Sequence, residues 1–259
     1  MTDAPFTVDL LARAEEVGLN ASVPPQQRLV DGWLLRFSPG KAKRARSIQA
    51  ISAGRLSLPD KLALCREVYA AAGLPMLLRI TPFCAPAGLD AALERVGMRT
   101  LDDTRVMLRD GLTLRRAKPL PDRVEIAPLG LVEYAELIGQ LRGSSSSQRQ
   151  AHAQRLLNAP VPFFPRVLTL DGEVAACGQF ALEGQFAGLY DVFTAPRHRG
   201  QGLARRLCEQ LLGEAASRGA RIAYLQVEGD NRPARAVYHR LGFADGYAYH
   251  YRTPDPDAV

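Results

Sequence analysis

The stretch that decides the fold runs from Asp191 to Ala204 and reads DVFTAPRHRGQGLA. It opens with apolar, β-branched and aromatic residues, a composition typical of a strand. Pro196 ends that strand, because proline has no N–H to give to a ladder. After the glycines, apolar residues recur every four positions, which predicts an amphipathic helix. These residues are Leu203, Leu207, Leu211 and Ala215.

The glycines between strand and helix predict an anion-binding site. The first N–H groups of a helix have no internal partner, and the helix dipole favours negative charge there. Gly200 and Gly202 would let a phosphate approach the backbone, since no Cβ stands in its way. No lysine-bearing P-loop pattern follows, and Arg205 stands where the dinucleotide motif has its third glycine. The stretch fits the pattern Arg/Gln-x-x-Gly-x-Gly/Ala instead, with Arg199, Gly202 and Ala204.

A second motif follows a predicted strand at residues 221–227. From Asn231 to Phe243 the sequence has the pattern N-x-x-A-x-x-x-Y-x-x-L-G-F. Four of its side chains share one helix face by their spacing, and Gly242 ends that helix as a left-handed cap. They are Ala234, Val237, Tyr238 and Leu241. In this order and spacing, the two motifs together resemble the signatures of the GNAT acetyltransferase superfamily.

The resemblance implies an α/β (α+β) fold in which mixed, mostly antiparallel sheets are flanked by helices. The predicted order β-α-α-β-β-β-α-β-α-β over residues 119–252 is similar to that fold. It also implies acetyl-CoA as co-substrate, with its pantetheine arm along the strand and near Asn231, and its pyrophosphate on the glycine loop. The expected coenzyme A-binding residues are Val192, Phe193, Thr194, Arg199, Gly200, Gln201, Gly202, Leu203, Ala204 and Asn231.

Acetyl transfer from a thioester to an amine needs a general acid and a general base. Tyr238 is the candidate acid for the leaving thiolate, because a phenol with a reference pKa of about 10 is protonated at neutral pH. The alternative is a tyrosine that only packs in the core. Glu228, at the end of a strand, is the candidate base, and Asp191 is the second choice. Either carboxylate could instead be a structural hydrogen-bond acceptor.

The N-terminal half repeats the order of elements found in the C-terminal half. Residues 65–80 parallel residues 208–227, since each has a helix, a glycine and a strand. Residues 93–98 likewise parallel residues 238–243. The resemblance therefore implies a tandem arrangement of two GNAT-like copies. The alternative is a coincidental similarity between two αβ halves.

The expected domains are a GNAT-like copy at residues 1–118 and a GNAT acetyltransferase domain at residues 119–259, joined through a basic, proline-containing linker at 113–121. The first copy departs from the family pattern. Residues 53–58 read AGRLSL where the glycine loop should be, and Leu93 stands where the second copy has its tyrosine. We expect this copy to be degenerate and not to bind coenzyme A productively.

Composition narrows the function classes. The chain has 259 residues, a length that suits one large or two modest domains, and a net charge of +6. The densest basic run, residues 41–46, has no aromatic residue and lies between two predicted strands. It is better read as a solvated loop than as a nucleic-acid surface. The excess of positive charge would also attract the phosphates of coenzyme A.

Targeting and metal signals are missing from the sequence. Residues 1–10 lack a basic start and an apolar core, and no stretch approaches the ~20 apolar residues of a membrane span. The four cysteines are scattered and lack metal-ligand spacing. We therefore expect a cytoplasmic protein that uses no metal and binds neither membrane nor nucleic acid.

The sequence thus predicts an N-acetyltransferase that moves an acetyl group from acetyl-CoA to a primary amine by direct attack in a ternary complex. The acceptor would be a small molecule or a peptide, and a homodimer is possible. The alternative from another class is a non-catalytic module that binds or senses acyl-CoA. Tyr238 and Asn231 together favour the enzyme.

Overall fold

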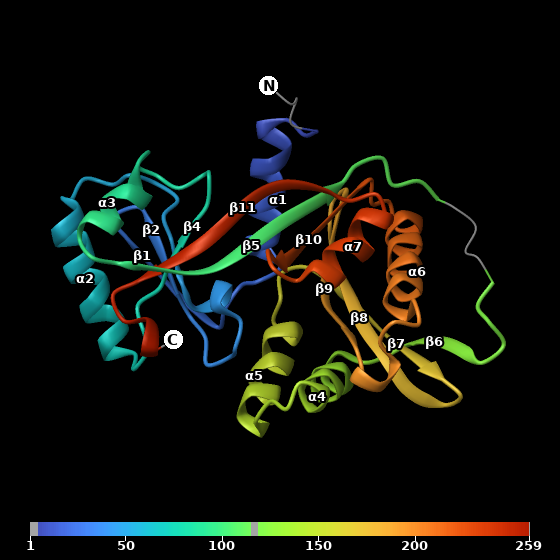
Figure 1. Ribbon diagram of the computed structural model, residues 1–259. Helices are drawn as coiled ribbons and strands as arrows, with labels where there is room; N and C mark the ends of the chain where they lie inside the picture. Colours follow the sequence, from blue (N-terminus) through green and yellow to red (C-terminus); the bar gives the residue numbers. More distant parts are fainter. Residues whose placement is uncertain (1–4, 115–118, 259) are drawn as a thin grey trace. The chain divides into compact units, whose positions relative to one another are not determined.

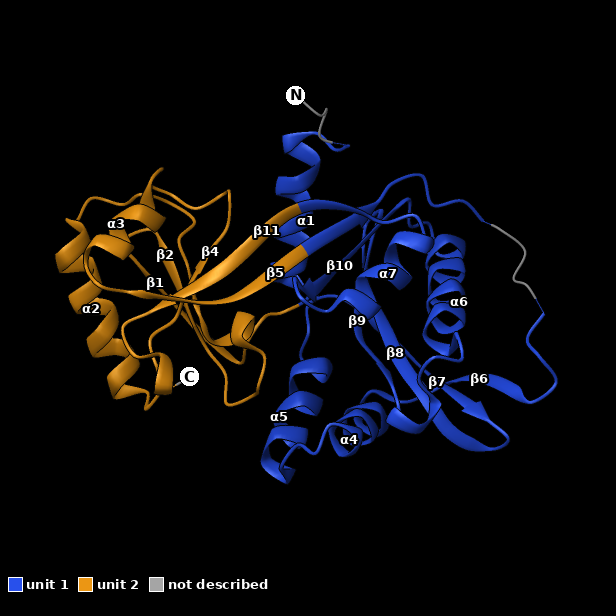
Figure 2. Cartoon of the chain, viewed as in Figure 1, with its two compact units in different colours: residues 1–21, 106–246 blue, residues 22–105, 247–259 orange. Residues whose placement is uncertain are grey.

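The computed structural model describes residues 5–114 and 119–258. The described chain forms two compact units (Figure 2). Unit 1 takes the described residues of Met1–Ala21 and Val106–Gly246, and unit 2 those of Ser22–Arg105 and Tyr247–Val259. The mixture of helices with a mostly antiparallel sheet confirms the predicted fold class.

Unit 1 is built on a sheet in which the strands follow the order β6-β7-β8-β9-β10-β5 (Figure 1). Neighbours from β6 to β9 are antiparallel, whereas β9 and β10 are parallel. A parallel pair needs a crossover, and α6 lies within the connection from β9 to β10. The bounds are β5 (Arg99–Arg109), β6 (Val124–Pro128), β7 (Phe163–Leu170), β8 (Glu173–Glu183), β9 (Phe186–Thr194), β10 (Ile222–Glu228) and α6 (Leu203–Ser217).

Side chains of the unit 1 sheet enter two separate cores. Ala176 of β8 belongs to the core that also holds residues of α6 and α7 (Arg232–Arg240), as the predicted apolar stripe of α6 requires. Its neighbour Cys177 belongs to the core with residues of α4 (Leu131–Leu141) and α5 (Ser146–Leu157). Successive residues of a strand point to opposite faces. The sheet therefore lies between α6 and α7 on one face and α4 and α5 on the other.

Helix α1 (Val8–Asn20) belongs to unit 1, although the sequence analysis placed it with the N-terminal copy. The Tyr224 hydroxyl donates a hydrogen bond to the carbonyl of Val17 at 3.2 Å. Arg13 forms an ion pair with Glu183 at 2.7 Å, and Asn20 also donates to that carboxylate. These contacts join residues far apart in sequence, so no local pattern could reveal them.

Unit 2 has the strand order β1-β2-β3-β4-β11. Strands β3 and β4 are parallel and the other pairs are antiparallel. Helix α2 connects β3 to β4, as α6 connects β9 to β10 in unit 1. The bounds are β1 (Gln26–Val30), β2 (Trp33–Phe37), β3 (Ile48–Gln49), β4 (Leu78–Ile80), β11 (Ala244–Thr253), α2 (Leu58–Ala71) and α3 (Leu89–Arg95).

The division into units differs from the predicted boundary between residues 118 and 119. It falls inside two strands, because β5 and β11 each contribute residues to both units. The C-terminal part of β11 pairs with β4, where His250 lies opposite Ile80. The predicted linker at 113–121 lies partly outside the described residues. The two predicted domains therefore stay a proposal.

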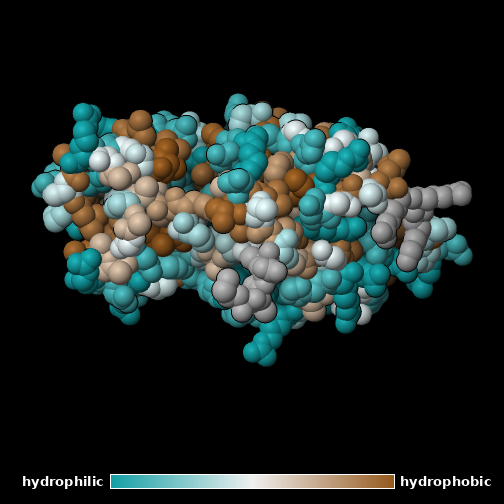
Figure 3. Space-filling model, turned by 90° about the horizontal axis from the view of Figure 1, so that it is seen from above, coloured by the Kyte–Doolittle hydropathy of each residue, from teal (hydrophilic) through white to brown (hydrophobic). Residues whose placement is uncertain are grey.

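The surface shows polar and apolar residues interspersed on the face seen in Figure 3. Large exposed apolar side chains occur on different elements, for example Val8 on α1, Leu29 on β1 and Leu157 on α5. Among the described helices, none has both the length and the hydropathy required to span a membrane. The basic run at residues 41–46, expected as a simple loop, contains a 3₁₀ turn at Lys43–Arg46 with Ala45 buried.

Candidate functional site

The glycine loop joins β9 to α6 as the sequence predicts. Strand β9 ends at Thr194, a 3₁₀ turn covers Pro196–His198, and α6 begins at Leu203. Gly200 and Gly202 both have φ of +77°, a conformation that side-chain-bearing residues rarely adopt. Apart from the adjoining residues, no described atom lies within 4 Å of the place that a Cβ would take on either glycine. The loop therefore leaves open space in front of its backbone.

The N-terminus of α6 lacks a side-chain cap among the described residues. Gly202 is its N-cap and offers no oxygen to the first N–H groups of the helix. In α1, α2, α5 and α7, by contrast, a side chain accepts one of these N–H groups, whereas the short helix α3, which begins after Gly88, has no side-chain cap either. The capping residues are Thr7, Ser57, Ser145 and Asn231. Helix α6 thus presents N–H groups and the positive end of its dipole at an exposed loop.

Arginines flank the strand that leads to this loop. The Arg199 Nε donates to the carbonyl of Thr194 at 3.3 Å, and its guanidinium carbon lies 6.0 Å from the centre of the Phe193 ring. The guanidinium of Arg142, just after α4, lies 5.9 Å from the same ring. The structure therefore brings Phe193, Thr194 and Arg199 together, while Val192 packs against the α6 core.

A β-bulge distorts β9 just before these residues. Asp191 and Val192 of β9 face the single residue Gly178 of β8, so β9 has one residue more than its partner at this point. Asp191 has φ of +53°, and the Tyr134 hydroxyl donates to its carbonyl at 3.2 Å. Bulges re-aim side chains at functional sites. This one turns the Asp191 carboxylate into a cluster of polar groups from three further elements.

The Asp191 carboxylate is surrounded by donors. Arg142 Nη1 lies 2.7 Å from one oxygen, and Gln179 Nε2 donates to the other at 2.9 Å. His152 Nε2, on α5, lies 3.4 Å from that second oxygen. This last approach falls outside good hydrogen-bond geometry, so it is a close contact between imidazole and carboxylate. The side chains of Asp191 and His152 are only 18% and 19% exposed.

These neighbours make Asp191 a poor proton acceptor. Burial alone would raise the pKa of Asp191, but His152 and the charge of Arg142 lower it well below the usual range. A carboxyl that stays ionised at every physiological pH takes up a proton weakly. Its geometry suits the positioning of Arg142 and His152. Glu228, the first choice for the base, is the exposed last residue of β10.

Tyr238 lies in the core beneath α6, only 9% exposed, with the Phe243 ring 6.0 Å away. Burial raises its pKa and nearby Cys208 adds to this, while the charge of Arg142 acts in the opposite sense. The net shift is upward, so the hydroxyl stays protonated and can donate. Asn231 caps α7, since its side-chain oxygen accepts the N–H of Ala234 at 3.2 Å.

The buried thiols are not activated nucleophiles. Burial raises the pKa of Cys65 to about 11, and those of Cys177 and Cys208 to about 12. A thiolate is the nucleophilic form, and these residues are almost entirely thiol at neutral pH. Within residues 5–114 and 119–258, no group of three or more His, Cys, Asp or Glu side chains could hold a metal ion.

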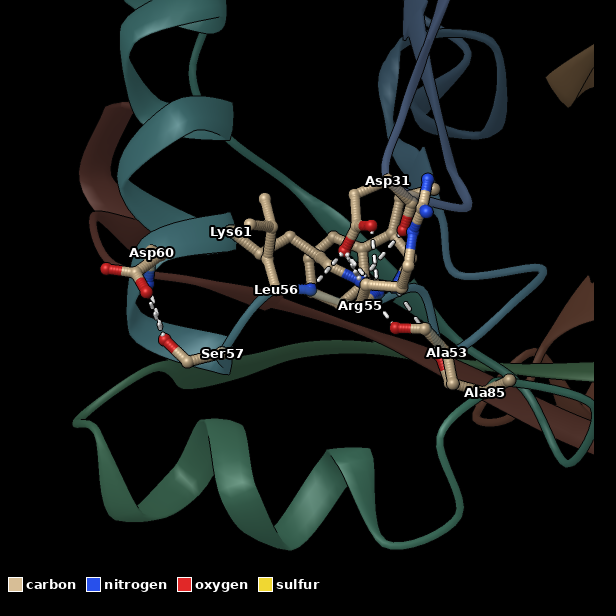
Figure 4. A network of polar contacts seen from close by, with 9 residues as sticks. Asp31, Ala53, Arg55, Leu56, Ser57, Asp60, Lys61 and Ala85 are labelled. Carbon is tan, nitrogen blue, oxygen red and sulfur yellow. Dashed lines mark hydrogen bonds and ion pairs between the residues drawn. The ribbon is translucent and has the colours of Figure 1, made fainter.

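In unit 2, the loop before α2 corresponds to the glycine loop before α6, and a carboxylate of the chain itself binds to it (Figure 4). The loop before α2 presents its N–H groups to Asp31, which accepts from Arg55 at 2.8 Å and from Leu56 at 2.9 Å. Asp31 lies in the turn between β1 and β2 with φ of +43°. Ser57 caps α2 by accepting the N–H of Asp60. The N–H groups around the start of α2 are thus taken by side chains of the chain itself.

Lys61 holds this carboxylate in place. Its ammonium lies 2.8 Å from Asp31 Oδ2 and donates to the carbonyls of Asp31 and Ala53, while its side chain is only 2% exposed. It also lies 4.9 Å from the centre of the Trp33 ring, a cation–π contact. A Cβ on Gly54 would come within 2.1 Å of the Asp31 carbonyl oxygen, so the loop requires glycine there.

None of the four side chains that contact Asp191 was predicted from the sequence. These are Tyr134, Arg142, His152 and Gln179. They lie on α4, after α4, on α5 and on β8, and Arg142 is 49 residues from Asp191. The signal that could have found them is Asp191 itself, because a carboxylate within a buried strand requires partners.

Comparisons with known proteins agree with this geometry. The profile of the acetyltransferase (GNAT) family matches residues 133–243, which contain both motifs. The chain is similar to the uncharacterized N-acetyltransferase YobR of Bacillus subtilis, with 26% identity over 238 residues that cover 87% of this chain and 91% of the relative.

Two solved structures share the fold. A GCN5-related N-acetyltransferase from Kribbella flavida matches with a TM-score of 0.70 and 19% identity, covering 98% of this chain and 97% of that one. A tandem GNAT protein from the clavulanic acid biosynthesis pathway matches with a TM-score of 0.64 and 17% identity, covering 96% and 94%. At these identities the likeness shows the fold alone.

The Asp31 network predicts a pH dependence of stability. The hydrogen bond with Lys61 and the N–H groups of Leu56 and Arg55 lower the pKa of Asp31 to about 2. An unfolded aspartate titrates near ~3.9, so between these values the unfolded chain binds more protons and stability rises with pH. This contribution should be complete above about pH 4 and lost as the pH falls to about 2.

Urea unfolding followed by fluorescence can test this, because Trp33 is the only tryptophan and lies beside Lys61. The difference in unfolding free energy between wild type and Asp31→Asn should shrink from pH 5 to pH 2. Asp102→Asn serves as control, since Asp102 also has a positive φ but pairs with Lys43 at the surface. A difference for Asp31→Asn that stays constant over this range would contradict the assignment.

Proposed function

Because the chain belongs to the GNAT superfamily, we propose that it moves an acetyl group from acetyl-CoA to a primary amine by direct attack in a ternary complex. The observation that carries this proposal is the uncapped start of α6 behind the glycine loop. Open space faces Gly200 and Gly202, and N–H groups and a helix dipole point toward it. A pyrophosphate is the group that such a surface accommodates.

The residues around the loop suit the other parts of coenzyme A. Arg199 adds positive charge at the loop, as expected for a phosphate contact. Residues 192–194 begin at the second residue of the bulge in β9, and their backbone would receive the pantetheine arm as an added strand. Asn231 uses its side-chain oxygen to cap α7, which leaves its amide NH₂ to act as donor toward this arm.

Tyr238 is the proposed general acid. Its upward-shifted pKa keeps the hydroxyl protonated, so that it can give a proton to the departing thiolate. The raised pKa values of Cys177 and Cys208 speak against an acyl-cysteine intermediate, since neither thiol is ionised at neutral pH. Direct attack of the amine on the thioester is therefore the simpler route.

The proposed activity belongs to unit 1, and the copy in the N-terminal half is proposed to be degenerate. The Asp31 carboxylate accepts the N–H groups of Arg55 and Leu56 at the loop before α2. An anion already stands where a phosphate would have to bind, and Lys61 neutralises it. This arrangement supports one coenzyme A site in each chain.

One test of the proposed site is Gly202→Val. The branched side chain would enter the open space at the start of α6 and would be strained at φ of +77°. We expect calorimetric titration to give one coenzyme A per wild-type chain and no measurable binding for the variant. Gly172→Val is the matched control, because Gly172 has φ of +80° and open surroundings in the turn between β7 and β8.

The control should lose stability through the same backbone strain and still bind coenzyme A. Unchanged affinity in Gly202→Val, with a folded protein, would contradict the loop assignment. Two equivalent coenzyme A sites in each wild-type chain would contradict the proposed degenerate copy.

Another test is Tyr238→Phe, which removes the proton donor and keeps the ring. We expect an unchanged dissociation constant for coenzyme A and a kcat lower by ~10²–10⁴-fold, the usual range for general acid catalysis. Tyr224→Phe is a suitable comparison, because that buried tyrosine contacts α1 and is outside the proposed site. A Tyr238→Phe variant with full kcat in single-turnover kinetics would leave Tyr238 as a packing residue.

The function itself is tested by thiol release from acetyl-CoA with a panel of amino acids, polyamines, aminoglycosides and peptides. We expect turnover with at least one amine. Binding of coenzyme A without turnover on any acceptor would instead favour a non-catalytic acyl-CoA-binding module.

A further inference from the structure

The cluster around Asp191 contains a group that can act as a base. Acetylation of an ammonium yields an amide, a thiol and one proton, so a residue must take up that proton. The Asp191 carboxylate accepts from Arg142 and Gln179 and is held ionised. Among the side chains that face it, His152 carries an imidazole, which can accept a proton on one ring nitrogen while the other nitrogen faces the carboxylate.

The geometry sets the roles of the two imidazole nitrogens. His152 Nε2 faces the Asp191 carboxylate at 3.4 Å, which favours the tautomer with hydrogen on Nε2. Nδ1 then carries the lone pair that can accept a proton. The side chain is 19% exposed, so the imidazole is partly shielded from water and still partly open to solvent. A histidine oriented by a carboxylate is a recurring general base.

Asp191 also connects the imidazole to the strand that is proposed to hold the acyl donor. It immediately precedes residues 192–194, which are proposed to hold the pantetheine arm. The Arg142 guanidinium bonds to Asp191, lies over the Phe193 ring, and acts electrostatically on Tyr238. The candidate base and the candidate acid are thus both linked to Arg142.

We propose that His152 is the general base of the acetyl transfer and that Asp191 is its positioning residue, an inference that rests on the proposed function. His152 Nδ1 takes a proton from the acceptor ammonium, and the nitrogen lone pair forms the new bond to the thioester carbonyl carbon. The carbon–sulfur bond breaks, and Tyr238 protonates the sulfur. After the bond has formed, the acceptor nitrogen loses a second proton, which restores the hydroxyl of Tyr238. The proton on His152 passes to solvent.

The other charged groups near His152 are compatible with this role. Arg142 lies after α4, and Arg155 on the same helix as His152 also acts on Asp191. Both charges help to keep the carboxylate ionised. Tyr134 and Cys177 stay neutral, because burial raises the pKa of each.

A first test needs no co-substrate. The chain has only four histidines, so ¹⁵N-histidine NMR with His152→Gln identifies the His152 signal. We expect the Nε2-protonated tautomer in wild type and loss of this preference in Asp191→Asn. A wild-type His152 protonated on Nδ1 would overturn the inference.

The second test uses kinetics with the amine that the acceptor panel identifies. His152→Gln should lower kcat by ~10²–10⁴-fold with unchanged coenzyme A affinity, and the acidic limb of the kcat/KM profile should disappear. A fluorinated analogue of the same amine is a weaker base and is therefore neutral at lower pH. Because it needs less help in losing a proton, His152→Gln should lower its kcat by a smaller factor. A purely structural role of His152 would penalise both amines equally.

His250→Gln is the matched control, because His250 also contacts a carboxylate, Asp90 at 2.9 Å, but lies in unit 2. It should leave the rate and the pH profile unchanged. A His152→Gln variant that keeps the acidic limb or penalises both amines equally would overturn this inference alone. Absence of turnover by wild type on every amine would overturn the proposed function and this inference with it.

Discussion

Unpaired N–H groups at the start of a helix are the constraint on which both units depend, because such groups need an acceptor. In unit 2, the Asp31 carboxylate and Ser57 supply acceptors around the start of α2, and the buried Lys61 balances the charge. In unit 1, Gly202 supplies none, and the start of α6 faces open space. At the start of α2 the chain itself supplies acceptors for the N–H groups. At the start of α6 a bound anion could supply them.

The Asp191 cluster presents the opposite requirement. Here the chain buries a negative charge, which needs hydrogen-bond donors and positive charge around it. A buried carboxylate is costly unless it is paired and hydrogen-bonded. Gln179 from β8 and Arg142 from the end of α4 meet that demand, and the bulge in β9 aims the carboxylate at them. The same contacts fix the backbone before residues 192–194. The strained backbone at Asp191 is thus held by several contacts close to the glycine loop.

Prediction from the sequence succeeded where chemistry and local pattern coincide. The glycines at 200 and 202, the apolar stripe of α6 and the order of elements all follow from short-range signals, and the structure has them. It failed where partners are distant in sequence, as for His152 with Asp191 or α1 with Tyr224. It also missed β1, an exposed strand with no apolar alternation to reveal it. Asp31 carries no motif at all, and its role depends on Arg55 and Leu56, more than 20 residues later.

The boundary between the units inside β5 and β11 has a consequence for how the chain is made. Ribosomes deliver a protein from its N-terminus, and domains generally fold as they emerge. Unit 2 begins at Ser22, yet its β11 segment starts only at Tyr247, after all of unit 1 has been synthesised. The edge of β4 that pairs with β11 therefore has no partner until residues 250–252 have been synthesised. A premature stop just before Tyr247 would therefore remove a strand from unit 2, the unit whose synthesis is otherwise complete at Arg105.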